Sequence, residues 1–166
     1  MTEGFEELFE TDTVLENGWA IDGECTRNIA NGELVLDCSR RCMLRKGPMF
    51  IRLEFAVNFR SLQSGAVGEF GLVLENGTDE AFRLGIDREN RSLTAAGHTS
   101  ERLPLPQDFD LAQYHQLRII KAGGDALCYI DDLCLGKFPM SPGETRAAVY
   151  TSGAAVGIEM IRVTRI

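Results

Sequence analysis

The sequence predicts an all-β fold, a two-sheet antiparallel β-sandwich or jelly roll formed by residues 1–166 as one domain. Its 166 residues, of which 44% are hydrophobic, suffice for two packed layers around one core. Apolar and polar residues alternate with a period of two through most of the chain, and no segment has the period of an amphipathic helix. Turn residues separate the short alternating runs at the spacing typical of sandwiches and jelly rolls.

The clearest predicted strand covers residues 49–60. Its hydrophobic side chains share one face, which should line the core: Ile51, Leu53, Phe55, Val57 and Phe59. Runs 66–75 and 81–87 repeat the pattern, and Asn76-Gly77 between them suits a tight hairpin turn. We therefore expect these three strands to be sequential neighbours that share one polar face.

The second half of the chain reads as a meander of short strands near residues 114–121, 126–130 and 133–138. Turns are predicted at the sequences that favour them: Asp87-Arg88-Glu89-Asn90, Gly123-Gly124-Asp125, Asp131-Asp132 and Ser152-Gly153.

Two features concern how the layers connect. Pro104 and Pro106 exclude residues 103–110 from a central strand, so this segment should cross between the sheets. The alternating strand 154–166 should be paired inside a sheet, which places the two chain termini close together.

Charge and cysteine content indicate the partners and compartment. The net charge of −8 opposes binding to nucleic acid or to an anionic membrane surface. Residues 1–10 contain four glutamates where a secretory signal needs a basic start and an apolar run, and no apolar stretch is long enough to cross a bilayer. Because the five cysteines are odd in number, we expect them to be reduced and the protein to be cytoplasmic.

Several segments resemble a known family. They are residues 114–121 (YHQLRIIK), 128–132 (CYIDD) and 149–151 (VYT) with the final strand, and Gly18-Trp19 and Gly32-Glu33-Leu34 near the start. This pattern is similar to concanavalin A-like lectin/glucanase sandwich domains, including those that accompany bacterial glycoside hydrolases. The resemblance implies a non-catalytic carbohydrate-binding or accessory module whose partner is an oligosaccharide or polysaccharide.

A sugar site needs planar hydrogen-bonding side chains and an aromatic ring. The predicted groove is the shared polar face, with these candidate residues: Arg52, Glu54, Asn58, Arg60, Glu69, Glu75, Arg83, Asp87 and Arg118, extended by Tyr129 and Arg162. The alternative is that the Arg–Glu pairs only keep an exposed sheet soluble. Trp19, Tyr114 and Tyr150 are interpreted as packing residues rather than stacking platforms.

Two other functions stay open, a small sandwich-fold glycoside hydrolase or polysaccharide lyase, and a self-association module that forms a homodimer. The sequence has no Glu-x-Asp-x-x-Glu string, so no catalytic residue is assigned and the question of an enzyme is left open. His115 shares a face with Leu117 and Ile119 and is interpreted as structural.

No cofactor is expected. Cys38-x3-Cys42 and Cys128-x5-Cys134 lack the Cys-x2-Cys spacing of structural zinc sites. Calcium is possible at loop carboxylates, and residues of the right kind are Asp22, Asp125, Asp131 and Asp132, without a motif that assigns a ligand.

Overall fold

The computed structural model describes residues 4–11, 18–62, 68–77 and 79–166. Within these residues the chain forms thirteen β-strands and no helix, which confirms the predicted all-β class. The strands are β1 (Gly4–Glu7), β2 (Ala20–Asp22), β3 (Thr26–Ala30), β4 (Glu33–Arg45), β5 (Leu53–Ser61), β6 (Glu69–Glu75), β7 (Glu80–Asp87), β8 (Ser92–Ala96), β9 (Ser100–Pro104), β10 (His115–Ala122), β11 (Asp125–Ile130), β12 (Leu133–Pro139) and β13 (Arg146–Arg165).

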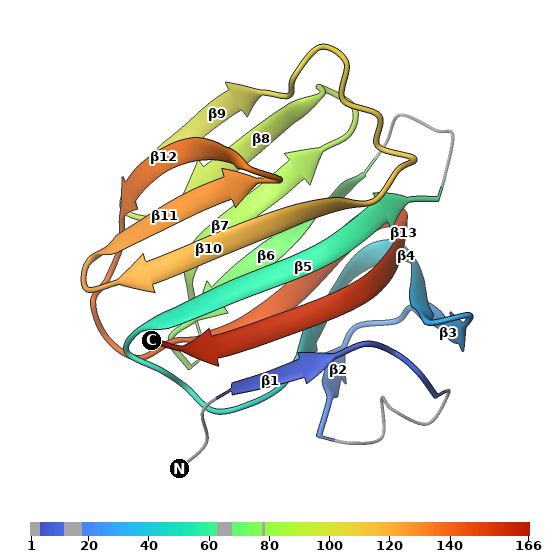
Figure 1. The fold of residues 1–166 in the computed structure, drawn as a ribbon, viewed down its shortest axis with the longest axis horizontal. Coiled ribbons are helices and arrows are strands. Elements are labelled where there is room, and N and C mark those ends of the chain that lie inside the picture. The colour runs from blue at the N-terminus through green and yellow to red at the C-terminus, as the bar shows by residue number, and fades with distance from the viewer. Residues whose placement is uncertain (1–3, 12–17, 63–67, 78) are drawn as a thin grey trace.

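One hydrogen-bonded network runs in the order β12-β11-β10-β5-β13-β6-β7-β8-β9 and folds into two layers (Figure 1). The front sheet contains β12, β11, β10, β5, the second half of β13 and β1. The back sheet contains β9, β8, β7, β6, the first half of β13, and residues 41–45 of β4 with β2. Residues 34–38 of β4 follow the second half of β13 into the front sheet, where β3 pairs with them. All pairs are antiparallel, so the predicted two-sheet sandwich is confirmed.

The last strand joins the two layers. Residues 146–152 of β13 pair with β6, whereas residues 156–165 pair with β5. The predicted turn at Ser152-Gly153 is wrong, because the strand continues through a β-bulge there and Gly153 takes the left-handed φ of 64°. The bulge bends the strand from one sheet to the other without ending it.

The expected order of the first strands also needs correction. β6 and β7 are neighbours, as predicted, but β13 lies between β5 and β6. The strand predicted at 49–60 begins only at Leu53, and Ile51 is 57% exposed ahead of it. Phe50 instead pairs with Thr145 in an isolated bridge. The first residues of the run 66–75 lie outside the described part of the chain.

The core lies between the sheets and confirms the predicted inward faces. Leu53, Phe55, Val57 and Phe59 of β5 are at most 2% exposed. Phe59 meets Phe70 of the back sheet with ring centroids 4.6 Å apart, so aromatic packing links the layers directly. At the margin of this core Trp19 packs edge-on against Phe5 at 5.7 Å, as expected for a packing residue.

Most predicted turns are present. Asp87 pairs with Ser92 around the turn at 88–91, Ala122 pairs with Asp125, and Ile130 pairs with Leu133 around Asp131-Asp132. Pro104 ends the outermost strand of the back sheet, and the segment after it crosses to β10 in the front sheet (Figure 1). Gly4 pairs with Thr164, so the ends of the described chain lie side by side, as predicted.

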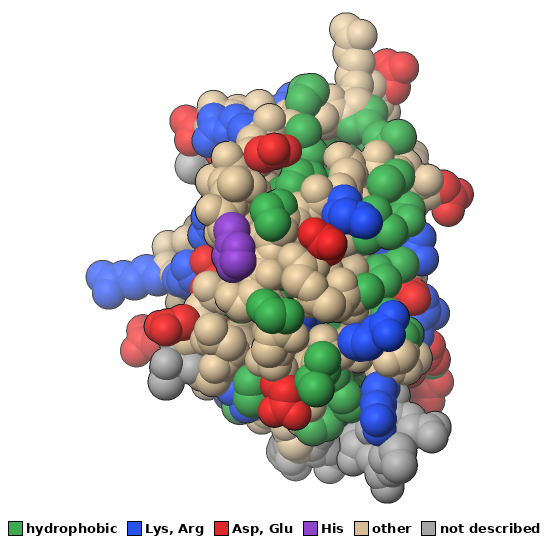
Figure 2. Space-filling model, turned by 90° about the vertical axis from the view of Figure 1, so that its left-hand side faces the viewer, with side chains coloured by type: hydrophobic (Ala, Val, Ile, Leu, Met, Phe, Trp, Pro, Cys, Tyr) green, Lys and Arg blue, Asp and Glu red, His purple; other side chains and the backbone are tan. Residues whose placement is uncertain are grey.

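The main path of the network ends at the edge strands β12 and β9. The predicted self-association would use exposed edge strands of this kind. Figure 2 shows the side of the molecule on the left of Figure 1, where acidic, basic and hydrophobic side chains are interspersed. Homodimer formation stays a prediction, tested by molar mass in solution. Among the described residues, no helix is long and apolar enough to span a membrane.

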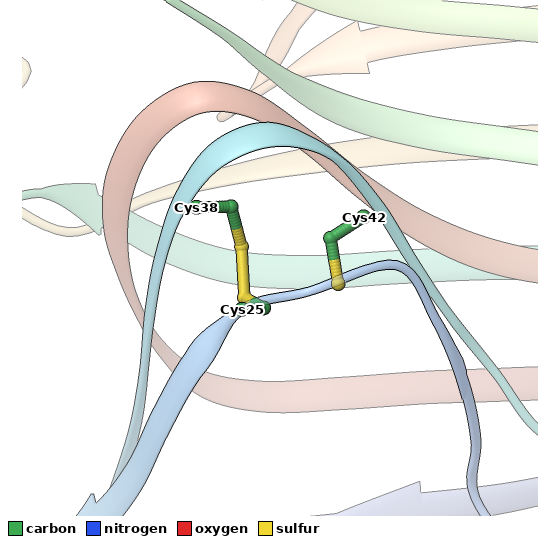
Figure 3. A group of neighbouring side chains, drawn as sticks. All are labelled: Cys25, Cys38 and Cys42. Atoms are coloured by element: carbon green, nitrogen blue, oxygen red, sulfur yellow. A yellow bond between two sulfur atoms is a disulfide. The ribbon is translucent and has the colours of Figure 1, made fainter.

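The cysteine prediction is wrong for two residues. Cys25 and Cys38 form a disulfide, because β3 places them opposite each other on neighbouring strands with Cα atoms 4.5 Å apart (Figure 3). An odd count leaves at least one cysteine unpaired but does not prevent a pair. Cys42, Cys128 and Cys134 are free thiols. The cysteine count therefore no longer supports a cytoplasmic location.

Candidate functional site

The predicted groove residues lie on two different sheets. Four face outward from the back sheet, namely Glu69, Glu75, Arg83 and Asp87, and four belong to the front sheet, namely Glu54, Asn58, Arg60 and Arg118. Arg52 precedes β5 and lines a separate hollow of about 560 Å³ with Glu144 and Arg165. The insertion of β13 between β5 and β6 divides the single expected surface.

The densest polar group on the back sheet surrounds Tyr150. We call it the Tyr150 cluster, and it consists of Arg41 on β4, Tyr150 on β13, Glu69 on β6, and Glu80 and Arg83 on β7. The Tyr150 hydroxyl donates to Glu69 Oε1, and the guanidinium carbons of Arg41 and Arg83 lie 5.3 and 5.9 Å from the ring centroid. Four neighbouring strands thus bring planar polar groups to one place.

Two glycines shape the sheet beneath this cluster. Tyr150, Gly71, Gly85 and Thr94 form one row across β13, β6, β7 and β8. A Cβ on Gly85 would lie 2.7 Å from Glu69 Oε1 and even closer to the Tyr150 hydroxyl. The absence of a side chain at Gly85 leaves room for the Tyr150 hydroxyl over β7, and Tyr150 is only 2% exposed.

Ion pairs complete the Tyr150 cluster. Arg41 is 3.2 Å from Glu80, and Arg83 lies between Glu69 at 3.8 Å and Glu80 at 3.9 Å. Burial and the hydrogen bond to Glu69 raise the pKa of Tyr150, so its hydroxyl stays protonated and donating. Among the described residues, the buried Arg83 Nε has no hydrogen-bond partner. This N–H is shielded from solvent and lies near Glu69 Oε1, so it belongs to the ion-pair network of the cluster.

The other back-sheet candidates have local partners. Glu75 accepts two hydrogen bonds from Arg45, at 2.8 and 3.1 Å, and lies 4.0 Å from Arg146. Asp87 accepts hydrogen bonds from the backbone and side chain of Asn90 and so closes the turn after β7. Asp87 thus has a structural role that the sequence pattern did not separate from binding.

On the front sheet, Glu54 lies between two arginines, 3.7 Å from Arg118 and 3.6 Å from Arg162. Arg118 also stacks over Tyr129, with its guanidinium 4.2 Å from the ring centroid. The structure therefore brings together the predicted Glu54 and Arg118 and the two residues expected to extend them. We call these four residues the Glu54 cluster.

A hollow of about 330 Å³ opens at the end of the front sheet. Its lining includes Asn58, Tyr114, Gln116, Asp131 and Glu159. Gln116 donates to Asn58 at 2.9 Å, and Asn58 donates to Glu159 at 3.5 Å. Glu159 reaches the hollow because a β-bulge interrupts the pairing of β13 with β5, a feature that alternation alone cannot reveal.

Arg60 lies beside this hollow and binds Glu33. Its guanidinium donates two hydrogen bonds to the carboxylate, at 2.6 and 2.8 Å, and Tyr114 also donates to Glu33. The hydrogen bonds from Arg60 lower the pKa of Glu33, and burial with the bond to Glu33 raises the pKa of Tyr114 to about 12. Glu33, Arg60 and Tyr114 therefore hold one another in place through hydrogen bonds.

Glu33 should make stability depend on pH. The pKa of Glu33 in the folded protein lies below the ordinary 4.5. Its contribution to the free energy of unfolding is therefore present above pH 4.5 and is lost as the pH falls through the pKa of the folded state. Glu33→Gln should cost about 1 kcal/mol at neutral pH, a figure reduced for the partial exposure of Arg60, and less in acid. Urea unfolding of the wild type and of Glu33→Gln, from neutral to acid pH, tests this expectation. A difference in unfolding free energy that does not change with pH would contradict it.

His115 lines the hollow of about 330 Å³, and its structural role stays a prediction. Nδ1 lies 2.8 Å from Asp131 Oδ2, Nε2 lies 2.6 Å from the Asp110 carbonyl oxygen, and the ring stacks on Phe109 at 3.7 Å. The possible calcium residues do not form one group, since Asp22 pairs with Arg45 of the back sheet while Asp131 belongs to the front sheet. Calcium binding stays a prediction.

Sequence reasoning identified Glu69 and Arg83 but missed their partners. The sequence pattern assigns no role to Arg41 or Glu80, and it predicts Tyr150 only as a packing residue. The period-two pattern assigns each side chain to a face, and β4 and β13 become neighbours of β6 only through long-range pairing. No local signal in the sequence links Arg41 to Tyr150.

Solved structures of carbohydrate-related proteins share this fold. A sialidase superposes with a TM-score of 0.80 and 9% identity over 98% of this chain, which spans 18% of the sialidase chain. A Bacillus licheniformis β-glucanase superposes with a TM-score of 0.77 and 12% identity, and the match covers 100% of both chains. The carbohydrate-binding module CBM66 from Bacillus subtilis superposes with a TM-score of 0.69 and 11% identity. This match covers 89% of this chain and 95% of the module.

No family model matches the sequence, and the search of curated proteins finds no match. Identities of this size show the fold alone. The chain has the concanavalin A-like sandwich fold of glucanases and carbohydrate-binding modules, as the sequence resemblance implied.

Proposed function

We propose that this protein is a non-catalytic carbohydrate-binding module and that its ligand binds at the Tyr150 cluster. The observation that carries the proposal is the convergence of Arg41, Glu69, Arg83 and Tyr150 from four adjacent strands, beside the side-chain-free positions Gly71 and Gly85. The shared fold with a carbohydrate-binding module and with glucanases supports a saccharide as the ligand class.

The chemistry of the cluster suits sugar hydroxyl groups. A carboxylate accepts hydrogen bonds from hydroxyls, and guanidinium N–H groups donate to hydroxyl and ring oxygens. Glu69 and Arg83 supply one of each within a few ångströms, and both side chains are partly exposed. Tyr150 is covered by its neighbours, so its role is to orient Glu69 rather than to stack on a sugar ring.

The direction of the Tyr150 pKa argues against this residue as a general base. A lyase of this fold class would use a tyrosine as general base, and a base needs a pKa near the working pH. Burial and Glu69 raise the pKa of Tyr150, so its hydroxyl stays protonated at neutral pH. The hydrolase or lyase alternative is tested by looking for cleaved products with every saccharide that binds.

Glu69→Gln should weaken saccharide binding by about tenfold to a hundredfold, because it removes a charged acceptor worth about 1.5–3 kcal/mol. The measurement is calorimetric titration of the wild type and the variant with neutral and acidic oligosaccharides that raise the melting temperature.

Glu54→Gln is the matched control, since Glu54 also lies 3.7 Å from an arginine but on the front sheet. It should bind like the wild type. Equal losses in both variants, or a loss only in Glu54→Gln, would place the ligand elsewhere and contradict the proposal.

A further inference from the structure

Three of the five cysteines converge at one place. The Sγ atoms of Cys25, Cys38 and Cys42 all lie within 4.8 Å of one another (Figure 3). Cys38 and Cys42 belong to β4 on either side of its exposed residues 39–41, and Cys25 comes from the segment that connects β2 with β3. The disulfide joins two of these sulfurs, and Cys42, a buried core residue, places a third beside them.

The spacing of the sulfurs suits a metal once the disulfide is open. Zinc–thiolate bonds of about 2.3 Å hold sulfur atoms about 3.8 Å apart. The third sulfur already lies within 4.8 Å, and two reduced sulfurs must separate to a similar distance because they no longer share a bond. The side chains of Cys25 and Cys38 must move apart, next to the point where β3 and β4 begin to pair at Thr26 and Asp37.

The surroundings limit what else Cys42 can do. Cys42 is 1% exposed, and burial raises the pKa of its thiol while Arg27 acts in the opposite direction. A buried protonated thiol is a poor nucleophile, which argues against a role in thiol exchange. A soft metal ion displaces thiol protons directly, and the partly exposed Cys25 provides its route of entry.

We propose that, in the reduced protein, Cys25, Cys38 and Cys42 form a three-thiolate site for a thiophilic divalent cation of the zinc class. A phosphine reductant supplies two electrons that open the disulfide and becomes the phosphine oxide with oxygen from water, leaving two thiols. The cation then replaces the protons of three thiols and forms three metal–sulfur bonds. Arg41 of the Tyr150 cluster directly precedes Cys42 in β4, but metal binding by the three sulfurs requires no saccharide.

Cadmium is the spectroscopic probe, because its bonds to thiolates absorb in the ultraviolet. Reduced wild-type protein should bind one Cd²⁺ per chain with a sulfur-to-cadmium band and release about three protons per ion. The oxidised protein should show no such band. Binding should also raise the melting temperature of the reduced protein.

Cys42→Ser removes the third sulfur and keeps the disulfide pair. It should bind Cd²⁺ at least about tenfold more weakly and release about two protons per ion. Cys134→Ser removes an exposed cysteine of β12 and should match the wild type. Trypsin cuts after Arg27, Arg40 and Arg41, so disulfide-linked peptides show that Cys42→Ser folds with the native pair.

Two results would overturn the proposal. One is the absence of the sulfur-to-cadmium band in the reduced wild type. The other is a Cys42→Ser variant with the band intensity, affinity and proton release of the wild type.

Discussion

Cys25→Ser is expected to lower the free energy of unfolding by about 3 kcal/mol. The disulfide closes a segment with a sequence separation of 13 residues, so its loss releases the unfolded chain from that constraint. It also removes the covalent link between β4 and the segment that joins β2 to β3. These two short strands then depend on hydrogen bonds, core packing and the Asp22–Arg45 ion pair.

Urea unfolding with a metal chelator present measures this effect. Cys134→Ser should keep wild-type stability, because Cys134 is an exposed free thiol. After reduction the wild type should fall to the stability of Cys25→Ser. A variant as stable as the oxidised wild type would show that the disulfide does not constrain the chain.

Gly71→Ala is expected to cost about 2–3 kcal/mol, at the upper end for an overpacked site. The new Cβ would lie 2.6 Å from the Cα of Gly85 and closer still to the carbonyl oxygen of Leu84. Both obstacles are backbone atoms of the neighbouring strand, so relief requires β6 and β7 to move apart in the middle of the back sheet.

Gly143→Ala provides the matched control, because nothing lies within 4 Å of a Cβ at that position. It should be neutral or slightly stabilising, since alanine restricts the unfolded chain more than glycine does. Thermal and urea unfolding of both variants test the pair of expectations. A Gly71→Ala protein as stable as Gly143→Ala would contradict the close approach of β6 and β7.

Local patterns predicted the strands with long alternating runs and the turns with Asn, Asp or Gly. Strand β5 has the expected inward face, and the hairpins after β10 and β11 turn at the predicted residues. The position of β13 between β5 and β6 could not be predicted, because that pairing joins residues far apart in the sequence. The pair Ser152-Gly153 predicts a turn, but Gly153 adopts its left-handed φ at a bend within strand β13.

The same limit applied to the candidate site. Alternation identified Glu54, Arg118, Glu69 and Arg83 as outward-facing, and the structure confirms those faces. It could not show that the first two belong to one sheet and the last two to the other. The disulfide could not be predicted from local pattern either, because Cys25 meets Cys38 only when β3 pairs with β4.

The continuous run of β13 through both layers has a consequence during protein synthesis. Residues 146–165 supply the interior strand between β5 and β6, and β1 has its partner there as well. A nascent chain on the ribosome therefore exposes unpaired edges on both layers until this segment has left the exit tunnel. Ribosome stalling before residue 146 should yield a protease-sensitive, chaperone-bound chain rather than a half-folded sandwich.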